Sequence, residues 1–92
     1  MSTLYVILQE GENSDSTQIH GKALVAMNYV YLGRWMIREG MDEDEVARKI
    51  SETVNYMCAL DERVACGFDR HTLELVKPYI NKDVDLKLLV LR

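Results

Sequence analysis

The sequence contains few of the residues that cross-link or interrupt a fold. Among 92 residues there are two cysteines, one proline and one tryptophan. Two cysteines cannot supply the disulfide framework of a small secreted domain, and one proline leaves long helices and strands possible. No apolar run approaches the eighteen or so residues of a membrane span. The first ten residues also lack the basic flank and cleavage site of a signal peptide, so we expect a cytoplasmic protein with reduced thiols.

An excess of basic charge is also absent. Fifteen acidic residues against eleven basic ones give a net charge of −4, and the lysines and arginines are scattered along the chain. Nucleic-acid binding is therefore not expected, because neutralising phosphates requires basic residues gathered on one surface. The hydrophobic fraction of 48% and the charged fraction of 28% are those of an ordinary folded protein. At this length we expect a single domain over residues 1–92.

The longest predicted element is a helix from Ser16 to Glu39. Apolar residues recur in this segment at helical spacings of three and four, in three stripes that leave few polar residues between them. A helix that is apolar on nearly all sides is typical of a central core element or a subunit interface. So small a chain has little surface with which to bury such a helix. We therefore expect a homo-oligomer, with a homodimer favoured.

Shorter elements surround this helix. Alternating apolar residues predict strands over Thr3–Gln9 and Val84–Arg92. Asp42, followed by Glu45, predicts the start of an amphipathic helix, and Asp69 predicts the cap of a short third helix that ends near Pro78. The segment Arg63–Cys66 is left open between a strand and a loop.

These elements together predict an α+β fold with the order β-α-α-α-β. In this fold the N- and C-terminal strands pair in a small sheet, which packs against the long central helix and the two shorter helices. Two strands alone are marginal, which is a second reason to expect either a third strand or a second copy of the chain.

Residues with catalytic or metal-binding chemistry form no convincing pattern. Cys58 and Cys66 lack the spacing of two to four residues that is typical of zinc sites, and Cys58 falls on the apolar stripe of its helix, as a buried thiol would. His71 and Glu74 can share a helix face as an acid–base pair, but such residues near a helix start are usually solvated. We expect no enzymatic activity, no cofactor and no metal.

Aromatic residues and arginines on the predicted long helix provide the candidate binding site. Both residue types are enriched in interface cores. The predicted partner-binding residues are Tyr29, Tyr31, Arg34, Trp35 and Arg38. They favour a small protein-binding or regulatory protein, such as an inhibitor, that acts by covering a surface on another protein.

Two alternatives remain open. One is a small-ligand-binding module with a pocket between the sheet and the long helix, in which Tyr29, Trp35 and the loop Glu10–Thr17 lie at the mouth. The other is a minor enzyme or enzyme subunit that uses His71, Glu74 or Cys66.

Overall fold

The computed structural model describes residues 2–9 and 30–91. The described elements are four strands, two α-helices and one short 3-10 helix. In chain order they are β1 (Thr3–Gln9), β2 (Val30–Trp35), α2 (Glu43–Leu60), β3 (Arg63–Phe68), α3 (Arg70–Val76), η1 (Lys77–Tyr79) and β4 (Asp85–Leu91).

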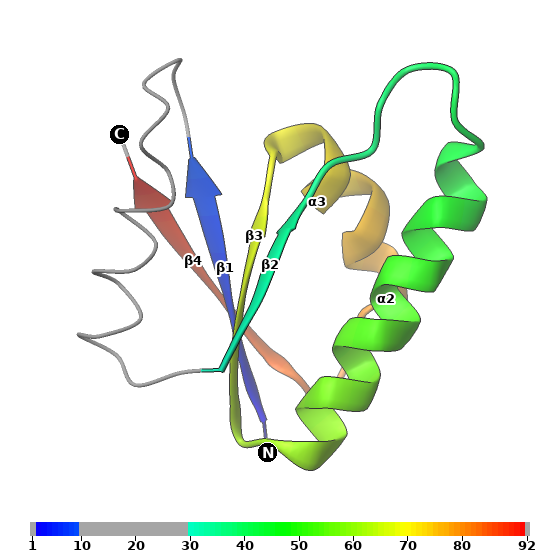
Figure 1. Cartoon of the computed structure of the whole chain (residues 1–92). Coiled ribbons are helices and arrows are strands. Elements are labelled where there is room, and N and C mark those ends of the chain that lie inside the picture. Colours follow the sequence, from blue (N-terminus) through cyan, green and yellow to red (C-terminus); the bar gives the residue numbers. More distant parts are fainter. Residues whose placement is uncertain (1, 10–29, 92) are drawn as a thin grey trace.

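The four strands form one sheet in the order β2-β3-β1-β4, and every neighbouring pair is parallel (Figure 1). The predicted pairing of the first and last strands is confirmed, with Thr3 opposite Asp85 and Gln9 opposite Leu91. The segment left open in the sequence is strand β3, which lies inside the sheet. Helices and strands are mixed as expected, but the parallel pairing makes this an α/β arrangement instead of the α+β fold predicted.

The predicted long helix is wrong over its last part. Val30–Trp35 is strand β2, which pairs with β3, and residues 36–42 form the loop that leads to α2. The first part of the prediction, residues 16–29, lies outside the described residues. Because the whole segment is apolar, its spacing does not separate a helix from a buried strand, and the β-branched and aromatic residues of β2 suit a strand.

The other two predicted helices are confirmed, and each begins at the expected aspartate. The Asp42 side chain accepts a hydrogen bond from the Glu45 amide at the start of α2, and Asp69 accepts one from the Thr72 amide at the start of α3. These bonds satisfy amides that have no partner within the helix. Pro78 lies in η1, directly after α3, as a residue that ends a helix would.

Helices α2 and α3 lie together on one face of the sheet (Figure 1). The core between them is built from side chains of β1 and β3 and from the inner side of each helix, and its largest members include Phe68, Leu4, Val54 and Val64. Ile7 and Ala65 alternate with these strand residues, so they point to the opposite face, yet they are also fully buried. The central strands are therefore enclosed on both faces, as is usual in parallel sheets.

Of the helices that the structure describes, none is long and apolar enough to cross a membrane.

Candidate functional site

The parallel sheet gives the molecule two different ends. All four strands point the same way, so the loops that follow β2 and β3 emerge at one edge, which we call the carboxyl end. Helices α2 and α3 both begin at this end, because each follows directly from one of those loops. Open parallel sheets usually bind their ligands and partners at this edge.

The predicted partner-binding residues do not share a helix face. Tyr31, Arg34 and Trp35 lie along β2, and Arg38 is exposed in the loop that follows, while Tyr29 lies outside the described residues. Trp35 is half-buried, and its ring centroid lies 5.6 Å from that of Phe68. The structure therefore brings Trp35 and Arg38 to the carboxyl end of the sheet.

The loop after β2 is held in place by a buried hydrogen bond to the start of α3. Ile37 is buried, and its amide donates a hydrogen bond of 2.7 Å to the Thr72 hydroxyl oxygen at the start of α3. Thr72 is itself fully buried, and its own amide is bonded to Asp69 at 2.7 Å. A buried amide must find an acceptor, so this bond fixes where the loop runs.

The same loop also exposes two methionine side chains to solvent. Met36 and Met41 have exposed fractions of 46% and 47%, and Arg38 and Glu39 are exposed between them. Gly40 has a positive φ of 92°, a conformation that suits glycine, and the Met41 amide bonds to the Arg38 carbonyl at 3.3 Å. We call residues 36–41 the methionine loop. Sequence patterning missed it because Met36 fitted an apolar helical stripe, although Gly40 marked a nearby turn.

An exposed ion pair joins the two helix starts beside this loop. The Nε2 atom of His71 lies 2.8 Å from a Glu43 carboxylate oxygen. The hydrogen bond that the His71 Nε2–H donates to the Glu43 carboxylate is the main cause that raises the pKa of His71 above its ordinary value. His71 is thus exposed and contacts Glu43 on α2, whereas the sequence offered Glu74 only as a possible partner and favoured solvated side chains.

The two cysteines are free, buried thiols, as predicted. Burial raises the pKa of both Cys58 and Cys66, so neither is readily converted to the thiolate that attacks substrates or binds metals. Across residues 2–9 and 30–91, no group of three or more histidine, cysteine or acidic residues is placed to hold a metal ion.

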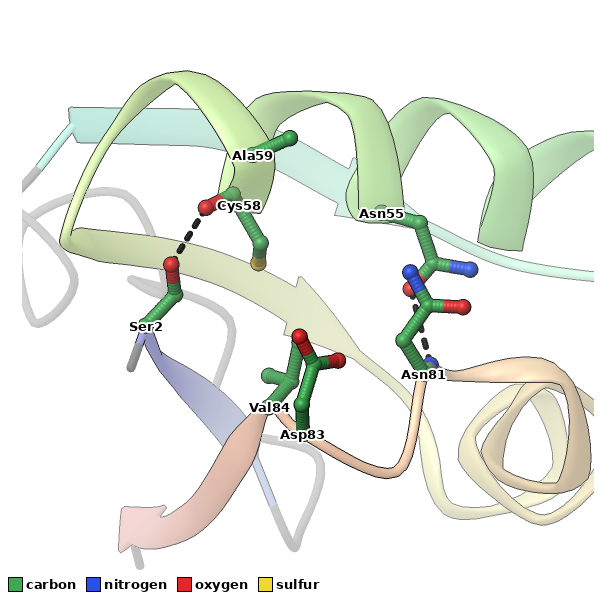
Figure 2. Close-up of a pocket in the computed structure, with 7 residues that line it drawn as sticks. All are labelled: Ser2, Asn55, Cys58, Ala59, Asn81, Asp83 and Val84. Carbon is green, nitrogen blue, oxygen red and sulfur yellow. Dashed lines mark hydrogen bonds between the residues drawn. The ribbon is translucent and has the colours of Figure 1, made fainter.

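The opposite, amino end of the sheet contains a pocket of about 250 Å³. It lies between the last turns of α2, the start of β1 and the loop before β4 (Figure 2). Its lining is mostly polar and consists of Ser2, Asn55, Cys58, Ala59, Asn81, Asp83 and Val84.

Hydrogen bonds hold the walls of this pocket together. The Ser2 hydroxyl donates to the Cys58 carbonyl, and the Asn81 amide donates to the Asn55 side-chain oxygen at 3.0 Å (Figure 2). The Asn55 side-chain nitrogen also donates to the Tyr79 carbonyl at 3.0 Å. The side chains of Asp83 and Val84 point from the loop before β4 toward α2. The last turn of α2 has no basic residue to offset the negative end of the helix dipole. The carbonyl end of the helix and the Asp83 carboxylate therefore both give this pocket a negative electrostatic potential.

Comparison with known proteins adds no function, since no protein-family model, curated protein or solved structure matches this chain.

Proposed function

We propose that this chain is a non-enzymatic, regulatory protein-binding protein that acts in the cytoplasm as a homodimer and covers a surface on another protein. The observation that carries the proposal is the methionine loop at the carboxyl end of the sheet, which exposes two half-buried methionines and is held by the buried hydrogen bond from Ile37 to Thr72.

Several properties of this loop favour a protein partner. Methionine side chains are flexible and polarisable, so they adapt to apolar partner surfaces. Arginine is enriched in interfaces, and Arg38 lies exposed between Met36 and Met41. The hydrogen bond from Ile37 to Thr72 holds the backbone in place, so little ordering is required on binding. The partner is expected to present apolar side chains to the loop.

The proposal is tested by affinity capture from the native host with matched variants. The test variant carries Met36→Ser and Met41→Ser, and the control carries Tyr56→Ser and Leu60→Ser, which remove two large side chains of α2 that are more exposed than the methionines. A protein retained by the wild type and the control, but lost with the methionine variant, is the expected result. Retention by all three proteins, or no specific partner at all, contradicts it.

Self-association remains part of the proposal, but its support has changed. The sequence predicted self-association from a helix over Ser16–Glu39 that is apolar on nearly all sides. Part of that segment, Val30–Trp35, is instead a strand of the chain's own sheet. What supports a dimer now is the outer strand β4, which carries Leu88 with an exposed fraction of 49%.

The amino-end pocket favours a second candidate, a small-ligand-binding module. The pocket lies at the C-terminal end of α2, and its described lining does not include Trp35, which the sequence had placed at the mouth of a pocket. Its acceptor oxygens, including Asp83, suit a small amine or another hydrogen-bond donor. Native mass spectrometry of the purified protein should show a bound small cation that is absent from Asp83→Asn. Protein free of any adduct, with no thermal stabilisation by small amines, excludes this candidate.

A further inference from the structure

Strand β4 is the outermost described strand beside β1. Its register with β1 is unbroken from Asp85 to Leu91, whereas the opposite outer strand, β2, has a register shift between Tyr31 and Arg34. No other strand in residues 2–9 and 30–91 pairs with the outer side of β4. Regular, unpaired edges act as templates for another strand, and irregular ones resist pairing.

The backbone of β4 directs the amides and carbonyls of alternate residues away from β1. The Asp85 amide donates to the Ser2 carbonyl at 2.9 Å, so Asp85 faces β1. Successive residues of a strand direct their amides and carbonyls to opposite sides, and Leu86 and Leu88 therefore face outward. Leu88 lies opposite Val6 in the register, so its side chain is on the face that carries α2 and α3, yet half of it is exposed.

Charged residues of β4 are complementary to a reversed copy of the same strand. Asp85 and Lys87 lie on the other face of β4, both exposed, with 3.9 Å between the lysine nitrogen and a carboxylate oxygen. In an antiparallel pair centred on Leu86, Asp85 of each copy lies opposite Lys87 of the other. These positions do not exchange backbone hydrogen bonds, so their side chains approach closely, with Cα atoms about 4.5 Å apart.

The geometry points to a second copy of this chain as the occupant of the β4 edge, in a two-fold dimer with antiparallel β4 strands centred on Leu86. This inference rests on the proposed self-association and names its surface. Leu86 pairs with its own equivalent, and Leu88 lies opposite Val84. The Val84 amide already bonds to the Asn81 carbonyl at 3.1 Å, so the antiparallel pairing ends there.

Variants that reverse the charges of Asp85 and Lys87 test both the dimer surface and its register. Sedimentation velocity across a range of protein concentrations should show that Asp85→Lys and Lys87→Asp each raise the dissociation constant of the dimer by about tenfold or more. Each variant places two like charges opposite one another, and the two-fold symmetry makes this happen at two places in the interface. The double variant should restore the wild-type dimer. An equimolar mixture of the two single variants should form a heterodimer, because one chain then carries two lysines and the other two aspartates.

Two further variants complete the experiment. Lys49→Asp makes the same change of charge on the exposed face of α2, where it should leave the dimer unchanged. Leu88→Lys should abolish the dimer, while far-ultraviolet circular dichroism shows each variant folded. If the dimer persists in Leu88→Lys and both charge variants, the proposed self-association stands and this surface is wrong. If the double variant fails to recover, the register is wrong. A wild-type protein that is monomeric at every concentration overturns both proposals.

Discussion

The two ends of the sheet are built in opposite ways. At the carboxyl end, Phe68 is buried against Trp35, and the buried amide of Ile37 in the methionine loop donates to the buried Thr72 hydroxyl. At the amino end, the same helix and sheet separate around a pocket whose wall is held by Asn55.

Because of this difference, the two ends are suited to binding partners of different size. A closed, well-packed base can present a loop in one conformation to a large partner, because the loop is ordered before binding. A hollow, polar end can enclose only a small molecule. Stability measurements on paired variants, one at each end, show whether the closed end is indeed the more tightly held.

The largest difference is expected from truncating one apolar side chain at each end. Phe68→Ala should lower the free energy of unfolding by about 3–5 kcal/mol, since it leaves a cavity beside Trp35. Val84→Ala, at the half-buried edge of the pocket, should cost about 1 kcal/mol. Urea unfolding followed by circular dichroism measures both values. Equal losses would show that the two ends are packed alike.

Thr72→Val tests the hydrogen bond beneath the methionine loop. The change keeps the shape of the side chain but leaves the buried Ile37 amide without its acceptor, so unfolding should become easier by about 1–3 kcal/mol. Amide hydrogen exchange at Ile37 should accelerate. The matched control is Thr53→Val, whose hydroxyl bonds to the Lys49 carbonyl on the exposed side of α2 and whose loss should cost little. Similar costs for the two variants would count against a special role for Thr72.

Asn55→Ala is the corresponding change at the amino end and should have a smaller effect. It removes two bonds to the chain at Tyr79 and Asn81, but the freed groups are near solvent, so the loss should be about 1 kcal/mol. Glu52→Ala, one turn earlier on α2, serves as the control. A loss as large as that of Thr72→Val would mean that the pocket wall is as tightly held as the loop base.

The smallest effect concerns pH at the carboxyl end. The pKa of His71 is raised, mainly by its hydrogen bond to Glu43, so the folded state binds this proton more tightly than the unfolded state. The resulting stabilisation is complete below the unfolded pKa of about 6.5 and is lost as pH rises through the higher folded value. It should be slight, because the pair is exposed. Titration of His71 by NMR should give a lower pKa in Glu43→Gln, and an unchanged value would contradict the pairing.

Local chemistry made much of the fold predictable from the sequence. The aspartate caps of α2 and α3 and the alternating pattern of β1 and β4 depend on neighbours in the chain, so they could be recognised directly. Strand β2 could not, because Val30–Trp35 continues an apolar segment in which helix and strand spacings coincide. Strand β3 is apolar on both faces, which hides its alternation for the same reason.

The candidate sites were harder to predict, since they depend on contacts distant in sequence. Trp35 and Arg38 were expected on a helix, and they reach the carboxyl end through a strand and a loop. Nothing in the local sequence links Ile37 to Thr72, or Asn55 to Asn81, because those contacts exist only after the sheet has brought α2, α3 and their loops together.

The strand order also governs how this protein can be made. Strand β1 precedes the other described strands, but its two neighbours, β3 and β4, both come from the last third of the given sequence. Their pairing with β1 therefore cannot form until those later residues have been synthesised, and such distant contacts form slowly. A nascent chain halted before Asp85 would leave strand β1 without its neighbour β4, so we expect stalled or truncated products to aggregate or to require a chaperone.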